Sequence, residues 1–234
     1  MKRFADYITE KLKLRNTIIY KYFPKTNDEL CKLVRYLIKE RGPDADFNDI
    51  DTSEITDMSE VFRGTDVRRI NISAWDVSNV TKTYRMFSSC LKLEEIDLSN
   101  WDTSKLMYAN YMFFGDSNFN ANLENWNLSS LFNASYMFFN CKKFNCNVSK
   151  WDVSSVVHMD GMFSECNKFN GNPGTWDVSN CMYFENMFYG NKALRCNFNN
   201  WKVNEKANID GMFTGCKDKT IPDWYFKYTD DSES

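Results

Sequence analysis

The chain has 234 residues, of which 43% are hydrophobic and 26% are charged, so the composition predicts a folded protein and excludes a disordered or low-complexity chain. The formal charge of -3 argues against a general nucleic-acid binder, because affinity for phosphates comes mainly from clustered Lys and Arg. No run of apolar residues is long enough to cross a membrane as a helix. Residues 1–45 carry eleven Lys or Arg and six Asp or Glu, so a basic N-terminal part precedes an acidic body.

The N-terminal part, residues 1–45, is predicted to form an α/β cap. Residues 2–13 read as a helix and Thr17–Phe23 as a strand. Thr26-Asn27-Asp28-Glu29 matches a capping box, and apolar residues then follow at helical spacing until Gly42-Pro43. A positive patch is formed by Lys2, Arg3, Lys11, Lys13 and Arg15. This patch either meets an acidic protein or nucleic acid, or is a solvated helix face.

A repeat of about 25 residues follows, and a period of this length decides the architecture of a chain. Six tryptophans, separated by 26, 25, 25, 25 and 25 residues, mark the copies: Trp75, Trp101, Trp126, Trp151, Trp176 and Trp201. A Met-Phe pair begins eleven residues after each of them, from Met86-Phe87 to Met212-Phe213. Ile50 and Val61-Phe62 keep the same offset in a degenerate first copy. Residues 46–220 are therefore expected to form seven coils.

Each copy is too short to bury its own Trp, Met and Phe, so like positions of successive coils are expected to stack into a continuous core. Before each Trp, apolar and polar residues alternate, as in Ile70-Asn71-Ile72, which predicts a short strand. The segment around Met-Phe is short and is predicted to form a single helical turn. Ile221–Phe226 is expected to cover the last coil, within a C-terminal cap and polar tail at 221–234.

The repeat units resemble a known family. Trp-Asp-Val-Ser-Asn-Val-Thr at 75–81, Ile-Asp-Leu-Ser-Asn-Trp-Asp-Thr-Ser at 96–104 and the recurring Met-Phe-x-x-Cys are similar to the BspA-like bacterial surface-protein repeat, a relative of the leucine-rich repeat. The resemblance covers about residues 46–220. It implies a non-catalytic solenoid that binds other macromolecules, often in adhesion at cell surfaces. The predicted fold class is a right-handed, leucine-rich-repeat-like β-solenoid of about seven 25-residue coils with an α/β N-terminal cap.

The eight cysteines are predicted to be buried, reduced thiols and not a metal site. Cys90, Cys141, Cys166 and Cys216 share one repeat position, and Cys146 and Cys196 share another. A recurring position inside a coil suits Cys as a small hydrophobe. No Cys-x-x-Cys pair occurs, and Cys141-x4-Cys146 with one distant His is weak evidence for zinc.

Catalytic chemistry is not predicted. His158, the only histidine, lies at a position that accepts Lys, Tyr and Asn in other copies, so a solvated side chain is expected. The Asp after Trp in four copies recurs as turn residues do. No Gly-rich phosphate loop is present. The sequence therefore predicts no enzyme, no catalytic residue, no cofactor and no metal.

Partner binding is predicted at aromatic residues that the repeat does not dictate. They cluster mainly in the third and fourth coils, and the set is Tyr108, Tyr111, Phe114, Phe132, Tyr136, Phe139, Tyr183 and Tyr189. Grouped exposed aromatics are typical of protein-binding hot spots. The alternative is that they pack against the neighbouring coil or a flanking loop.

A second candidate surface is the polar side of the strand segments. It comprises Asn71, Asp97, Asn122, Asn147, Asn172 and Asn197, beside Ser73, Ser99 and Ser149. Stacked amides are expected to bond one another along the sheet. Binding of a sugar or peptide is the alternative.

The predicted function is a non-catalytic protein-interaction module that binds a macromolecular partner through a lateral face of the solenoid. A phage or mobile-element protein that acts on a host protein or complex is one setting for it. The alternatives are an adhesion or assembly protein that self-associates, and a nucleic-acid-associated inhibitor that uses the basic cap. Because Glu10, Lys11 and Lys13 interrupt the start of the chain, no secretory signal is expected, and the predicted compartment is the cytoplasm.

Overall fold

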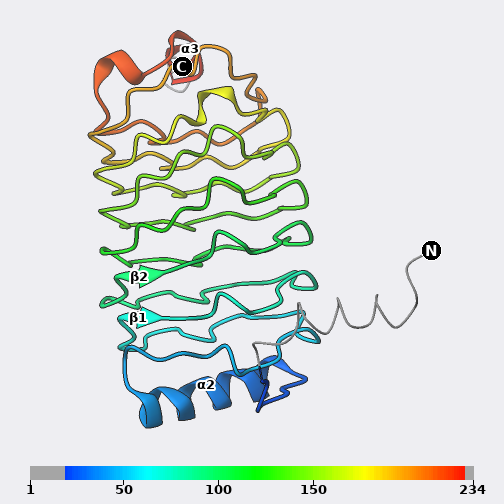
Figure 1. Cartoon of the computed structure of the whole chain (residues 1–234). Coiled ribbons are helices and arrows are strands. Elements are labelled where there is room, and N and C mark those ends of the chain that lie inside the picture. Colours follow the sequence, from blue (N-terminus) through cyan, green and yellow to red (C-terminus); the bar gives the residue numbers. More distant parts are fainter. Residues whose placement is uncertain (1–18, 230–234) are drawn as a thin grey trace, which may run out of the picture.

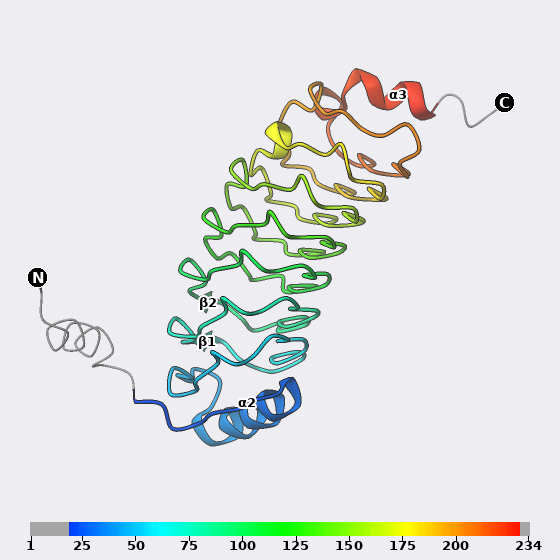
Figure 2. The ribbon, with the colours of Figure 1, turned by 90° about the vertical axis from the view of Figure 1, so that its right-hand side faces the viewer.

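The computed structural model describes residues 19–229, which wind into one stack of coils (Figures 1 and 2). The helix α2 (Asn27–Arg41) lies at the beginning of the stack and α3 (Asp223–Thr229) at its end. Between them lie the strands β1 (Arg69–Ile70) and β2 (Glu95–Ile96) and the 3-10 turns η1 (Pro173–Thr175) and η2 (Asp218–Thr220). The helix expected at 2–13 and its basic patch lie outside the described residues.

The predicted capping box starts α2, with one change of partner. The Thr26 hydroxyl accepts a hydrogen bond from the Glu29 amide at 3.2 Å, and the Glu29 carboxylate accepts one from the Lys25 amide at 2.6 Å. The helix ends at Arg41, and the amide of the C-cap Gly42 donates to the Ile38 carbonyl at 2.9 Å. The φ of Gly42, 83°, then turns the following chain out of the helix. The apolar face of α2 buries Leu30, Val34 and Leu37 against the first coil.

The strand predicted at 17–23 is reduced to a single parallel bridge between Tyr22 and Ile50 in the described part. The Asp49 carbonyl accepts from both the Lys21 and Tyr22 amides, at 2.8 and 3.2 Å. Pro24, which has no amide hydrogen, lies two residues before the helix cap Thr26. Pairing therefore ends after one residue.

Stacked aromatic rings form the core. The tryptophans of the six clear copies are only 3–5% exposed, as predicted. Beside them, the Phe of each Met-Phe pair continues a column from Phe62 to Phe213, with ring centroids 5.3–5.9 Å apart and nearly parallel planes. Each ring covers its neighbours, so the apolar interior is continuous from α2 to α3.

The Met-Phe segments are successive β-turns, so the predicted helical turn is wrong. In the second coil, the amides of Met86 and Ser88 bond within the coil to Thr83 and Arg85, while the Phe87 amide bonds to the next coil. This alternation depends on a left-handed residue before each Met, and the set is Glu60, Arg85, Tyr111, Tyr136, Gly161, Asn186 and Gly211. A helical turn would keep its hydrogen bonds within the coil, whereas these turns leave every second amide for the neighbouring coil.

The segments before each Trp alternate between buried and exposed residues, as predicted, but only two of them are regular strands in the described chain. β1 and β2 pair in parallel, with Ile70 opposite Ile96. In later coils a side-chain ladder joins the segments, beside one backbone bond from the Val148 amide to the Gly171 carbonyl at 2.7 Å. Asn120, Asn145 and Asn170 accept from the next coil's amide through their side-chain oxygens, at 2.8–3.0 Å. The class name, a right-handed leucine-rich-repeat-like solenoid, and the boundaries at 45 and 220 stay predictions.

Candidate protein-binding surface

Four half-buried rings on the outer side of the third and fourth coils form what we call the aromatic face: Tyr111, Phe114, Tyr136 and Phe139. Tyr111 stacks on Tyr136 with centroids 5.1 Å apart, and Phe114 stacks on Phe139 at 4.7 Å. The two pairs also touch, since Tyr111 lies 5.5 Å from Phe114. The face is thus one packed cluster, each ring of which keeps part of its surface in solvent.

The β-turns explain why these rings point outward. Tyr111 and Tyr136 hold the left-handed position before Met, with φ of 61° and 57°. The Met and Phe that follow are fully buried, so the turn divides its side chains between the core and the outside. A left-handed conformation costs a residue with a side chain about 1–2 kcal/mol, so the two tyrosines hold strained positions.

Two neighbours define the ends of the aromatic face. The Arg85 guanidinium lies over the rings of Tyr84 and Tyr111, 4.9 and 5.1 Å from their centroids. At the other end the Tyr136 ring covers Gly161, where an added Cβ would lie 2.4 Å from the ring. A cation therefore already stacks on one side of the cluster, and a glycine makes room for the ring on the other.

A second group of rings, Tyr108, Phe132 and Tyr183, forms what we call the aromatic row. It lies along the single parallel β-bridges that join successive coils just before the Met-Phe turns. Tyr108 contacts Phe132 edge to face at 6.0 Å, and Phe132 contacts His158 at 5.4 Å. His158 stacks on Tyr183 with centroids 4.5 Å apart. Phe132 is 38% and Tyr183 44% exposed. His158 is half-buried and not the solvated side chain expected from the sequence, because the repeat places it between two rings.

Carboxylates continue this outer side beyond the aromatic face. Asp160, Glu185 and Asp210 share one repeat position, and we call them the acidic row. The Asp160 carboxylate accepts from the Ser135 hydroxyl at 3.1 Å and lies 4.0 Å from His158 Nδ1. Burial, followed by the nearby Tyr111, Asp160 and Glu185, raises the pKa of Tyr136. The first two acids of the row are therefore close enough to act on the aromatic face.

The predicted set of eight residues is thus divided. The aromatic face holds Tyr111, Phe114, Tyr136 and Phe139, and the aromatic row holds Tyr108, Phe132 and Tyr183. Tyr189 is 41% exposed, but the buried Ser164 separates it in register from Phe139.

Sequence reasoning missed Tyr84, Arg85 and the acidic row as parts of this surface. Arg85 shares its repeat position with Tyr111 and Tyr136, and Tyr84 shares the position of Asp160. Comparison of these two positions across all coils is the signal that would have found them.

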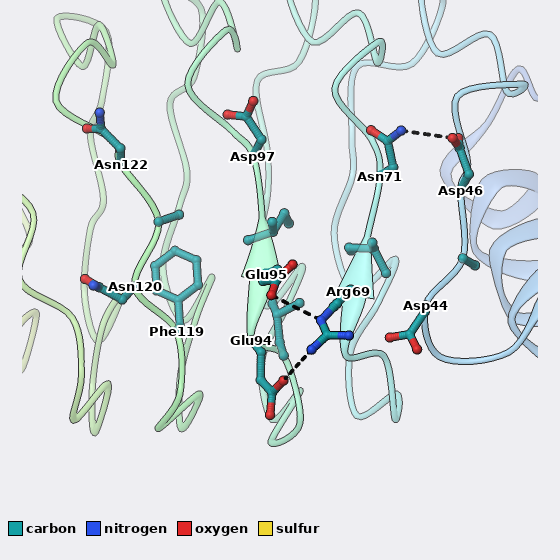
Figure 3. A pocket seen from close by; sticks show the side chains of 15 residues that line it. Asp44, Asp46, Arg69, Asn71, Glu94, Glu95, Asp97, Phe119, Asn120 and Asn122 are labelled. Atoms are coloured by element: carbon teal, nitrogen blue, oxygen red, sulfur yellow. Dashed lines mark hydrogen bonds and ion pairs between the residues drawn. The ribbon is translucent and has the colours of Figure 1, made fainter.

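The second candidate surface contains an open groove of about 750 Å³ across the strand segments of the first four coils (Figure 3). Five carboxylates line it, those of Asp44, Asp46, Glu94, Glu95 and Asp97. Arg69 bonds to Glu95 at 3.1 Å and pairs with Glu94 at 3.9 Å. The groove is acidic, and part of its charge is neutralised from within.

The amide ladder predicted on this surface is wrong in its position. The side-chain oxygens of Asp97, Asn122 and Asn147 accept from the amide two residues later in their own coil, at 3.0–3.1 Å. These are Asx-turns, which hold the corner of each coil. Between coils, the Asn71 side-chain amide donates to Asp46 at 2.9 Å, and the Cys146 thiol donates to the Asn122 side-chain oxygen at 3.8 Å.

The surroundings of the buried thiols do not favour the reactive thiolate form. Burial raises the pKa of Cys90 to about 12, and its thiol donates to the Phe62 carbonyl at 3.0 Å. The Cys141 and Cys166 thiols make the equivalent bonds to Phe113 and Phe138. Such thiols stay protonated and pack as part of the core. Among residues 19–229 no group of three metal-ligating side chains comes together, and none of the helices has the length and apolar character to cross a membrane.

A scan against protein families matches this chain to "Mycoplasma protein of unknown function, DUF285", over residues 35–145 and 111–224. The two matches overlap within the coils and together cover most of the chain. Among curated proteins and among solved structures, no match was found.

Proposed function

Since the chain belongs to the DUF285 family of Mycoplasma proteins, whose match spans the coils, we propose that it is a non-catalytic protein-interaction module. In this proposal the coils form a right-handed, leucine-rich-repeat-like solenoid related to the BspA-like repeats. The coils hold the backbone, and the outer side chains of the third to sixth coils bind a protein partner.

The observation that carries this proposal is the aromatic face. Tyr and Phe provide much of the binding energy at protein interfaces because they bury a large area with few rotatable bonds. The four rings already stack in pairs, at 5.1 and 4.7 Å, so little further order is lost when a partner covers them.

The backbone beneath the face supports the same proposal. The amides of Tyr111 and Tyr136 bond to the next coil at 2.9 and 2.7 Å, and the Phe113 and Phe138 rings behind them are fully buried. A turn that is hydrogen-bonded to the next coil and backed by a buried ring holds its outward side chain in a fixed direction. The surface is therefore preorganised for a partner of complementary shape.

The test is a cross-linking pull-down from the source cell with the full chain. The test variant combines Tyr111→Ala, Phe114→Ala, Tyr136→Ala and Phe139→Ala, and circular dichroism confirms that it is folded. The control variant combines Tyr36→Ala and Leu91→Ala, two side chains that are 55% and 60% exposed elsewhere. We expect the test variant to lose its specific partners and the control to keep them. Retention of every specific partner by the folded test variant would rule the proposal out.

A further inference from the structure

We propose that the partner of this surface is a basic protein segment that carries Arg or Lys next to an aromatic or large aliphatic residue. This inference rests on the proposed function and names the class of partner. The segment lies along the stack, with its apolar part on the aromatic face and its cations on the acidic row. It thus crosses from the third coil towards the seventh.

The first argument is that the acidic row keeps its negative charge. Within residues 19–229, no Lys or Arg forms an ion pair with Asp160, Glu185 or Asp210. Glu185 is contacted instead by the neutral side-chain amides of Asn186 and Asn208, at 3.3 and 3.4 Å. Glu185 and Asp210 therefore face solvent, and Asp160 is half-buried beside His158. None of the three carboxylates is paired with a Lys or Arg of the described residues.

Several acids elsewhere on the molecule are paired with cations, and others, such as Asp97 and Asp152, accept hydrogen bonds within their own turns. Asp49 forms a two-pronged pair with Arg41 at 2.8 Å, and Lys150 pairs with Glu124 at 2.9 Å. In the groove, Arg69 pairs with two glutamates. The groove therefore provides part of its own countercharge, whereas the acidic row leaves this to a partner.

The second argument is that the charged and aromatic parts form one surface. Asp160 and Glu185 are among the groups that raise the pKa of the Tyr136 phenol, after its burial and Tyr111. His158 links the acidic row to Phe132 and Tyr183 of the aromatic row. A cation placed beside these rings is therefore attracted by the ring faces and by the carboxylates together.

The third argument is that the molecule itself contains a cation stacked on these aromatic rings. The Arg85 guanidinium stacks on Tyr84 and Tyr111 at one end of the aromatic face. In the third, fourth and fifth coils the same position is occupied by Tyr111, Tyr136 and Gly161, so the protein supplies no further cation there. A guanidinium from a partner would contact the exposed parts of the Tyr136 and Phe139 rings, with Asp160 near Tyr136.

The test starts from a displayed library of random short peptides, selected on the full chain. Peptides kept by the wild type and lost by the aromatic-face variant above are sequenced, and the most enriched one is synthesised with a fluorescent label. Its dissociation constant is then measured by anisotropy at low and at high salt. The charge variant combines Asp160→Asn, Glu185→Gln and Asp210→Asn. The matched control, with the same change of charge in the groove, combines Glu94→Gln, Glu95→Gln and Asp97→Asn.

We expect the face-dependent peptides to be rich in Arg or Lys beside aromatic residues. The charge variant should bind about fivefold to tenfold more weakly, as the loss of three ion pairs at the surface implies, and high salt should reduce this difference. The groove control should bind as the wild type does.

Other outcomes overturn the inference in distinguishable ways. Face-dependent peptides that are neutral or acidic refute the basic partner and leave the proposed function standing. No face-dependent peptide at all counts against both proposals. If the groove control binds more weakly while the charge variant binds as the wild type does, the cations of the peptide lie in the groove. This outcome refutes the acidic row as their site.

Discussion

Asp116 interrupts the column of buried thiols. It holds the repeat position of Cys90 and Cys141, is completely buried, and neither of its carboxylate oxygens has a hydrogen-bond partner among the described residues. This burial raises the pKa of Asp116 to about 9. The side chain is therefore a neutral acid in the folded protein at neutral pH.

This residue makes stability depend on pH. Above about pH 4 the unfolded chain has lost this proton while the folded chain keeps it, so the free energy of unfolding falls from about pH 4 to about pH 9. Asp116→Asn removes the titrating group, and we expect it to stabilise the protein by about 1–3 kcal/mol at neutral pH and to flatten this slope. Urea unfolding across this pH range measures both effects.

Asn191 supplies the matched control, because it holds the same buried position in the sixth coil. In the orientation that satisfies its neighbours, its amide nitrogen donates to the carbonyls of Cys166 and Phe169 at 3.0 and 3.1 Å. We expect Asn191→Asp to destabilise the protein at neutral pH and to steepen the fall of stability with pH. Equal pH profiles for the wild type and Asp116→Asn would refute the assignment.

Trp101 is the exception among the buried indoles. In the other clear copies the buried indole donates to a carbonyl of the preceding coil, as Trp126 does to Leu98 at 3.0 Å. The Trp101 nitrogen is buried without a partner. The spacing from Trp75 to Trp101 is 26 residues where the others are 25, although equivalent positions such as Ile70 and Ile96 still pair.

At the scale of single elements, the side-chain ladder of Asn120, Asn145 and Asn170 joins coils that lack regular strand pairing. Asn145 takes part in two of these bonds. Its backbone amide donates to the Asn120 side-chain oxygen, and its own side-chain oxygen accepts from the Asn170 backbone amide. Asn145→Ala removes the second bond, and we expect a loss of about 0.5–1.5 kcal/mol in unfolding free energy.

Asn145→Asp keeps an acceptor oxygen and controls for this change. It should lose less stability than Asn145→Ala in the same thermal or urea unfolding measurement. Equal losses in the two variants would show that the side-chain oxygen is not what joins the coils.

The turn at Gly161 depends on the absence of a side chain. Its φ is 53°, and an added Cβ would overlap the Tyr136 ring. We expect Gly161→Ala to destabilise the protein by about 1–3 kcal/mol and to displace Tyr136 from the aromatic face. Combined with Tyr136→Ala, the substitution should keep only its backbone penalty, of about 1–2 kcal/mol. A double-mutant cycle by urea unfolding tests this, and strictly additive effects would argue against the overlap.

At the scale of the whole molecule, stability is carried by contacts between neighbouring coils. Phe138 stacks on Phe113 and Phe163 and also meets Phe144 and Trp151. Phe138→Ala opens a cavity in the middle of the stack, and we expect it to cost about 3–5 kcal/mol. Because coils interact only with their neighbours, the two halves should then unfold separately.

The measurement compares tryptophan fluorescence with circular dichroism during urea unfolding. Phe139→Ala, the next residue on the outer side, is the control and should lose much less stability because its ring is half-buried. A single coincident transition in Phe138→Ala, with a small loss, would show that the ring column is not the source of cohesion.

The sequence alone determined the period, the buried residues and the two ends of the helix α2. Trp, Met and Phe recur because each must meet its counterpart in the next coil, so their spacing reports the architecture directly. The Thr26 cap and the Gly42 stop act within a few residues and could be predicted for the same reason. The grouping of Tyr111, Phe114, Tyr136 and Phe139 also followed from register.

Only the tertiary structure decided how the coils are joined and which groups surround the aromatic face. The left-handed turns at Met-Phe and the asparagine ladder depend on hydrogen bonds to residues about one coil away, which local propensity does not contain. For the same reason the stacking of Arg85 and the unneutralised acidic row became visible only in three dimensions. A repeat fixes what is equivalent along the chain, but the contacts between unlike positions of neighbouring coils depend on how the chain turns between them.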